Sequence, residues 1–137
     1  MVVMQFYRPP RTNPPSDATA SFEAVVSPHL EVGAAVRRAC GDCHSNETTW
    51  PWYSNVAPMS WLISRDVVEG RAHLNLSEWN LYGPEKSRAR IADMCKEATA
   101  GEMPLWNYTV LHPNARLGQQ DVTRLCALSQ TDRASVR

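Results

Sequence analysis

Residues 37–54 read RRACGDCHSNETTWPWYS, and the fold depends on what this stretch binds. Cys40 and Cys43 are separated by two residues, and His44 follows directly. Cysteines three positions apart project from one side of a helix, so both thiols can add to the two vinyl groups of a haem while the adjacent histidine reaches the iron. The spacing therefore predicts one covalently attached c-type haem, with His44 as an axial ligand.

The same CxxC spacing has two other interpretations. A redox-active pair of the thioredoxin kind follows a strand at a helix N-terminus, where the thiol pKa is lowered, whereas Cys40 and Cys43 come at the end of a predicted helix. A structural zinc site needs a second clustered pair of ligands, and Cys95 and Cys126 stand alone on two other predicted helices. Both interpretations are therefore less favourable than haem.

Cys95 and Cys126 fall on the apolar faces of their predicted helices. Haem attachment implies an oxidising compartment, in which two such cysteines on neighbouring helices form a disulfide. The bond would close a loop of some thirty residues and stabilise the fold by about 3 kcal/mol. The alternative is a pair of buried free thiols.

Composition excludes several classes of protein. The 137 residues fit one domain, and 14 Lys and Arg balance 14 Asp and Glu, so there is no basic excess for nucleic acid. No run of about 18 apolar residues is present, and the opening MVVMQF is too short for a signal peptide. Because haem attachment requires export, we expect an anchor or cleaved signal before Met1, and a location in the periplasm or at the outer face of the cytoplasmic membrane.

The chain divides into an arm and a domain. Residues 1–26 contain the proline-rich run YRPPRTNPPSDATA, which favours an extended segment and excludes helix. A disordered terminus is the alternative, although Phe6 and Tyr7 could dock the arm onto a partner or onto the domain itself. Folding of the haem domain, residues 27–137, is expected to begin near Ser27.

Helical spacing of apolar residues and almost no strand-like alternation predict an all-α fold, a small cytochrome c-like domain. We expect helices over residues 27–44, 57–73, 83–101 and 119–130. Ser27 and Pro28 are typical of a helix start and would begin the first helix. Pro58 and Pro84 would begin the second and third helices, and Gly101 would end the third. Structureless loops over about 44–57 and 102–117 would wrap the haem.

The second axial position has several candidates, namely Met59, Met94, Met103, His29, His73 and His112. Met103 is favoured, because it follows a helix stop and precedes a proline in a loop able to lie over the haem. Met94 falls inside an apolar helix stripe and His29 at a helix start, which suggests packing or surface positions. His112 is the main rival, His73 comes next, and an open site is the remaining alternative.

Aromatic residues follow the haem motif closely. Trp52 and Tyr53 supply flat apolar surface together with an N–H or O–H group, and Arg71 comes shortly after. We expect these three residues to contact the haem propionates, although the rings could simply form the core. The Nδ1 of His44 is expected to donate to a backbone carbonyl around Pro51.

The sequence resembles the bacterial haem-binding domain family in two stretches, CGDCHSNETTWPWYSNVAPMSWLISRDVVEGRAHLNLSEW and GEMPLWNYTVLHPNARL. Its members are exported single-haem c-type proteins that often begin with a membrane anchor, and QFYRPPRTNPP resembles the segment after that anchor. The resemblance implies that Cys40, Cys43 and His44 attach and ligate the haem and that Met103 is the distal ligand.

The function expected from these features is one-electron transfer. Redox proteins are the expected partners, and near-neutral charge favours a subunit of a membrane-bound complex over a freely diffusing carrier. No general acid, nucleophile or substrate pocket is apparent, so we do not expect an enzyme. The alternative is a haem sensor or peroxidase with an open distal site.

Overall fold

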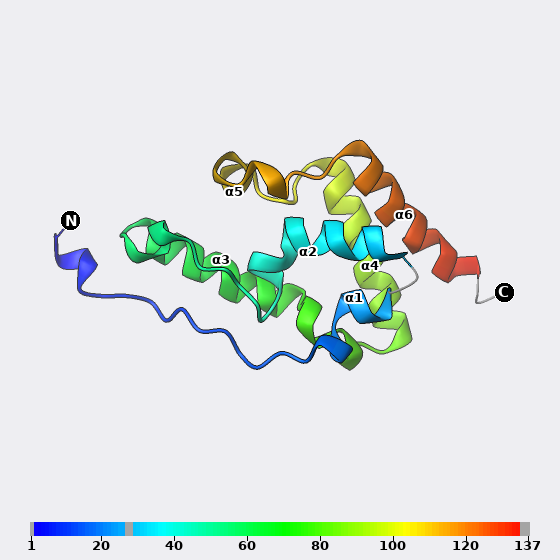
Figure 1. The fold of residues 1–137 in the computed structure, drawn as a ribbon, viewed down its shortest axis with the longest axis horizontal. Coiled ribbons are helices and arrows are strands. Elements are labelled where there is room, and N and C mark those ends of the chain that lie inside the picture. Colours follow the sequence, from blue (N-terminus) through cyan, green and yellow to red (C-terminus); the bar gives the residue numbers. More distant parts are fainter. Residues whose placement is uncertain (1, 27–28, 135–137) are drawn as a thin grey trace.

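The computed structural model describes residues 2–26 and 29–134, and this part of the chain contains helices and no strand. The α-helices are α1 (Phe22–Val25), α2 (Leu30–His44), α3 (Met59–His73), α4 (Pro84–Ala100), α5 (Trp106–Leu111) and α6 (Gln119–Ala134) (Figure 1). Short 3-10 helices are η1 (Val2–Gln5), η2 (Ala18–Ala20), η4 (Trp52–Asn55), η5 (Leu76–Leu81) and η6 (Pro113–Ala115). The predicted all-α fold class is confirmed.

One apolar core joins segments that lie far apart in the sequence. Phe22 of α1 meets Trp79 of η5 edge to face, with ring centroids 4.8 Å apart. Val36 of α2, Ile91 of α4 and Leu125 of α6 are buried in the same cluster. Because Phe22 is 1% exposed, packing of the core begins before Ser27, the residue at which folding was expected to start.

The helix boundaries follow the expected proline and glycine signals in part. Ser27 and Pro28, expected to begin the first helix, lie outside the described residues. Pro58 is the N-cap of α3, and Pro84 is the first residue of α4. Gly101 ends α4 with a φ of 73°. A positive φ is the left-handed conformation that glycine adopts without steric cost, so the predicted helix stop at Gly101 is confirmed.

The two connections expected to be structureless contain short helices, so that prediction is wrong. The first connection includes η4, and the second includes α5 and η6. In η4 the Ser54 hydroxyl donates to the Pro51 carbonyl (2.6 Å), and the buried Ser54 backbone also bonds Pro51. Local bonds of this kind satisfy backbone groups that an irregular buried loop would leave unpaired.

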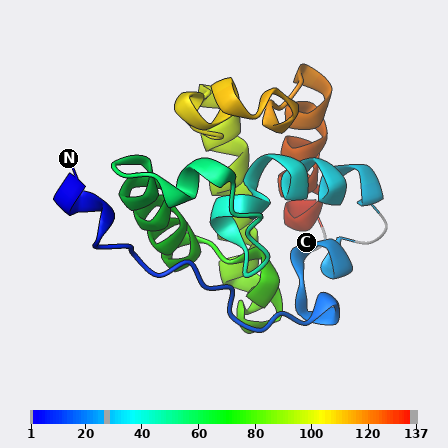
Figure 2. The same ribbon diagram turned by 60° about the vertical axis from the view of Figure 1, so that its left-hand side comes forward.

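Residues 7–17 of the N-terminal arm run extended along α3, as Figure 2 shows in blue. The arm is not extended throughout, because η1, η2 and α1 also belong to it, and η2 contradicts the expectation that the proline-rich run excludes helix. The Trp61 indole donates to the Tyr7 carbonyl (2.9 Å), and the Ser64 hydroxyl donates to the Pro10 carbonyl (3.0 Å). Tyr7 also packs edge to face on Trp61, whereas Phe6 is exposed. The arm therefore docks on its own domain through backbone carbonyls. Within the described segments, no helix combines the length and apolar character needed to cross a bilayer.

Candidate functional site

The CxxCH motif occupies the last turn of α2, where it lines a cavity of about 690 Å³. We define the α2–α3 wall of this cavity by the following residues: Cys40, Cys43, His44, Gly70, His73 and Leu74. We define the α4–α5 wall by these residues: Arg90, Met94, Glu97, Met103, Leu105 and Tyr108. A cavity of this size is large enough for a cofactor.

His44 is fixed by the C-terminal end of α3. Its Nδ1 lies 2.8 Å from the carbonyl oxygen of Gly70 and 3.1 Å from that of Leu74. Both partners can only accept, so Nδ1 carries the proton and Nε2 keeps its lone pair for a metal. Burial lowers the pKa of the imidazole, which favours the neutral form that a ligand requires. The carbonyl expected around Pro51 is therefore not the partner of His44.

Gly70 allows α2 and α3 to approach closely enough for these bonds. A Cβ at this position would lie 2.5 Å from the carbonyl oxygen of Cys43 and 3.3 Å from the Cys43 Cβ. Only a residue without a side chain fits such a contact. The absence of a side chain at Gly70 thus brings the α3 carbonyls to His44.

Met103 reaches the cavity from the segment after α4. The backbone N–H groups of Glu102 and Met103 both donate to the Glu97 carbonyl, at 3.1 and 3.4 Å, just beyond the turn at Gly101. Met103 is 37% exposed, so its thioether lies at the cavity and also near solvent. This segment places a soft sulfur ligand on the wall that does not carry His44.

The other proposed axial ligands differ in position. His73 and Met94 line the cavity, but His73 belongs to the same wall as His44. His112 does not line it: its ring stacks on Tyr108 at 4.3 Å, and its Nδ1 lies 3.2 Å from the Tyr108 carbonyl. The structure thus brings Met103, and not the main rival His112, to the cavity of His44.

The family comparison agrees with this geometry. A model of the haem-binding domain family, described as "Haem-binding domain", matches residues 1–131. The chain belongs to the haem-binding domain family. No curated protein and no solved structure matches it. This haem-binding domain is therefore a haem protein, and the cavity can be tested for its fit to haem.

The cavity of the haem-binding domain supplies what a haem requires. Cys40 and Cys43 are free thiols, and His44 presents an unprotonated Nε2 beside them. Met94, Leu105 and Leu125 add apolar lining, and the buried Nε of Arg90 lacks a hydrogen-bond partner. The donor set, the apolar lining and the unpaired Nε–H of Arg90 all fit a haem, which carries two carboxylates.

The three residues expected at the propionates do not line this cavity. Trp52 is 78% exposed on η4, and Tyr53 contacts His112 through its hydroxyl (3.3 Å). Arg71 donates instead to backbone and side-chain oxygens of the arm and of the turn after His44. Closeness in sequence to the CxxCH motif therefore does not bring these three residues to the cavity wall.

The thiols contradict the redox-pair and zinc interpretations. Burial raises the pKa of Cys40 to about 12 and that of Cys43 to about 11, whereas a redox-active CxxC has a lowered thiol pKa. Cys95 of α4 is bonded to Cys126 of α6, which confirms the predicted disulfide. Those two sulfurs are therefore not available as ligands for zinc.

Sequence reasoning missed the charged residues of the α4–α5 wall. Arg90, Met94 and Glu97 recur at helical spacing on one face of α4, and all three line the cavity. The face was interpreted as an apolar core stripe through Met94 and its neighbours. Arg90 and Glu97 lie at the same helical spacing as Met94, and these charges could have indicated that this face borders a polar group.

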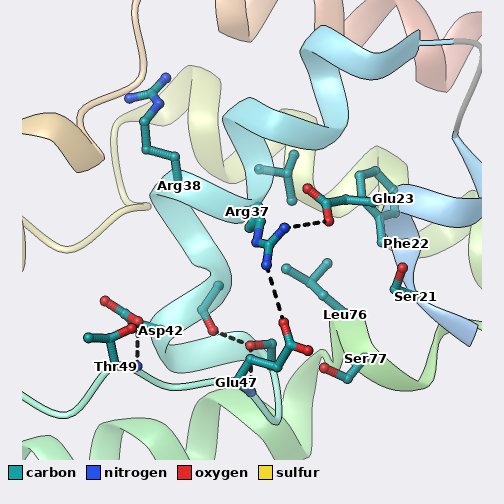
Figure 3. Close-up of a pocket in the computed structure, with 13 residues that line it drawn as sticks. Ser21, Phe22, Glu23, Arg37, Arg38, Asp42, Glu47, Thr49, Leu76 and Ser77 are labelled. Carbon is teal, nitrogen blue, oxygen red and sulfur yellow. Dashed lines mark hydrogen bonds and ion pairs between the residues drawn. The ribbon is translucent and has the colours of Figure 1, made fainter. Parts of the chain in front are cut away.

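A second cavity, of about 300 Å³, lies elsewhere along α2 and is lined by none of the CxxCH cysteines (Figure 3). Arg37 crosses it and pairs with Glu23 at 3.3 Å and Glu47 at 3.5 Å. These charges pair with one another at the surface, where such ion pairs contribute little to stability.

Proposed function

We propose that this protein is a single-haem c-type cytochrome that transfers one electron at a time. The observation that carries the proposal is that Cys40, Cys43 and His44 share one cavity with Met103. A bound haem supplies one-electron redox chemistry at its iron. Cys40 and Cys43 would hold it through thioether bonds to the vinyl groups.

His44 and Met103 are the proposed axial ligands. The two carbonyls that accept from Nδ1 of His44 orient the ring and make Nε2 more basic. A thioether from Met103 raises the reduction potential relative to a second histidine. With both positions filled, no site remains for substrate, so we propose a carrier and not an enzyme.

The proposed location is the periplasm or the outer face of the cytoplasmic membrane. The Cys95–Cys126 disulfide supports an oxidising compartment. We propose that the partners are redox proteins, such as subunits of a membrane-bound electron-transfer complex. Membrane association would come through a segment before Met1.

A haem sensor or peroxidase is the second candidate function. The observation that favours it is the exposure of Met103, which is 37%, because an exposed ligand can be displaced by a gas or by peroxide. Carbon monoxide distinguishes the two functions, since it binds ferrous haem only where the distal position is open or readily vacated.

Absorption spectra of the oxidised and reduced protein, with and without carbon monoxide, test the proposal. We expect the near-infrared band of methionine-ligated ferric haem, its loss in Met103→Ala, and no carbon monoxide shift in the wild type within the time that Met103→Ala needs to bind it. His112→Ala is the matched control, because His112 does not line the cavity, and it should keep the band. A wild-type protein that binds carbon monoxide readily would instead support the sensor or peroxidase.

Covalent attachment has its own measurement. The denatured protein should retain the mass of one haem, and Cys40→Ala should retain haem through a single thioether. Release of all haem from the denatured wild type would overturn the c-type assignment.

A further inference from the structure

We propose that Arg90 binds a haem propionate, an inference that rests on the proposal that haem occupies this cavity. Arg90 lies on α4, and its Nε is the single buried nitrogen or oxygen without a hydrogen-bond partner among the side chains that the structure describes. Buried polar groups in folded proteins are almost always paired. An unpaired donor on a cavity wall therefore points to a ligand that accepts from it.

The neighbours of Arg90 do not supply that acceptor. Its closest acidic partner is Asp93 on the same helix, with Nη1 3.8 Å from Oδ2, beyond hydrogen-bond distance. The Asp93 side chain is 65% exposed, so this pair is weak. The Nε edge of the guanidinium is left free, and that edge forms two parallel hydrogen bonds with a carboxylate.

The charge of the cavity supports a carboxylate at Arg90. Asp66, Glu69, Asp93 and Glu97 border the cavity, and Arg90 is the one lysine or arginine among the described lining residues. Haem carries two carboxylates, which the acidic side chains repel and Arg90 attracts. The propionate-bearing edge therefore faces Arg90.

The chemistry of attachment gives the same orientation. Vinyl and propionate groups occupy opposite edges of the porphyrin, so an edge held by Cys40 and Cys43 sends the propionates away from α2. Arg90 stands on α4, which provides the other wall of the cavity. Arg71, first expected to hold a propionate, already donates from Nε and both Nη atoms to protein oxygens.

Haem titration tests this role directly. In the full chain carrying Cys40→Ala and Cys43→Ala, which binds haem without thioether bonds, we expect Arg90→Gln to weaken haem binding about tenfold. We expect no such loss with haem dimethyl ester, whose carboxylates are blocked. Arg88→Gln removes the same charge from α4 outside the cavity and should change neither affinity. Equal weakening for haem and its ester, or none for either, overturns the proposal.

Stability without haem separates ligand binding from a structural role. Because Nε of Arg90 has no partner, Arg90→Gln should leave the unfolding midpoint of the haem-free chain unchanged or raise it. A clear loss would assign Arg90 to the fold and overturn the proposal.

The covalently loaded protein gives an independent measurement. Removing a cation beside the propionates should lower the midpoint potential in Arg90→Gln, with a much smaller change in Arg88→Gln. Equal potentials for Arg90→Gln and wild type contradict the Arg90 contact while leaving the His44 and Met103 assignment intact. A wild-type chain that binds no haem in this cavity overturns both proposals.

Discussion

The two walls of the proposed haem cavity are held in different ways. In the α2–α3 wall, the His44 side chain is held by the backbone carbonyls of Gly70 and Leu74, at the C-terminal end of α3. Gly70, which has no side chain, packs closely against Cys43. In the α4–α5 wall, backbone bonds to the Glu97 carbonyl hold the Met103 segment, and side chains tie the wall to other elements. The Tyr108 hydroxyl donates to Asp42 (2.6 Å), and the Cys95–Cys126 disulfide joins α4 to α6.

Because the walls are held differently, we expect substitutions to affect the positions of the two proposed axial ligands, His44 and Met103, differently. His44 is half-buried and held by backbone carbonyls, which a substitution can displace by moving the helices but cannot delete. Met103 is 37% exposed, and the wall that carries it is tied to other elements by side-chain contacts that substitutions can delete. We therefore expect changes in the α4–α5 wall to loosen the distal ligand while His44 stays in place.

Removing the disulfide should break the α4–α5 wall most strongly. The bond spans 31 residues, and the loss of such a cross-link costs about 3–4 kcal/mol through the entropy of the unfolded chain. Urea unfolding of Cys95→Ala/Cys126→Ala in the ferrous state should show this loss, together with faster carbon monoxide binding. A thiol reductant should destabilise the wild type equally and leave the double variant unchanged; a variant as stable as the wild type contradicts the prediction.

Substituting Gly70 breaks the α2–α3 wall. In Gly70→Ala the new Cβ meets the Cys43 carbonyl oxygen at 2.5 Å, so the helices must separate at a cost of about 2–3 kcal/mol. Because His44 then loses its acceptors, the reduction potential should rise as well. Gly41→Ala is the matched control, since its nearest neighbour, an Arg37 carbon, is 3.7 Å away. Equal unfolding midpoints for the two variants would rule out close helix approach as the reason for Gly70.

The Tyr108–Asp42 bond offers a finer test of the comparison. Tyr108→Phe removes a bond of 2.6 Å to a carboxylate, at a cost of about 1–2 kcal/mol, while the Thr49 N–H still donates to Asp42 (2.9 Å). Stopped-flow mixing with carbon monoxide should show faster binding, with His44 ligation unchanged. Tyr53→Phe is the control, because the Tyr53 hydroxyl has only His112 as partner, at 3.3 Å. Equal rates in both variants would count against a special role for Tyr108.

The smallest expected effect is a dependence of stability on pH. Burial and the bond to Asp42 raise the pKa of Tyr108 above its ordinary value of about 10. Above that pH the unfolded chain loses the phenol proton and the folded chain keeps it, so the contribution is complete below about pH 10 and declines as pH rises. The gap in unfolding free energy between wild type and Tyr108→Phe should narrow in that range. A gap that stays constant to high pH would contradict the shift.

The sequence predicted those parts of the site that rest on local chemistry. The CxxCH spacing, Pro84 and Gly101 act within a few residues of themselves, so the motif and the bounds of α4 could be predicted. The Cys95–Cys126 pairing followed from two helices with one leftover cysteine each. Met103 reaches the cavity because the turn at Gly101 directs the chain there, and its ligation stays a prediction.

The sequence did not indicate contacts between distant segments. The partners of His44 are backbone carbonyls near residue 70, and a carbonyl has no signature in a sequence. Trp52 and Arg71 follow the motif closely, but η4 turns Trp52 to solvent, and Arg71 is committed to the arm. Arg90 was overlooked because a charge beside an apolar stripe is usually a solvated position.

The hydrogen bonds of Arg71 connect the N-terminal arm to the turn after His44. The Arg71 guanidinium donates to the carbonyl of Ser45, the residue after His44 (2.7 Å). It also donates to the Thr12 carbonyl (2.8 Å) and to the Asn13 side chain (2.9 Å) of the arm. A displacement of the arm at Thr12 and Asn13 would therefore be transmitted through Arg71 to the turn beside His44. A single side chain thus makes the position of the turn after His44 depend on the position of the arm.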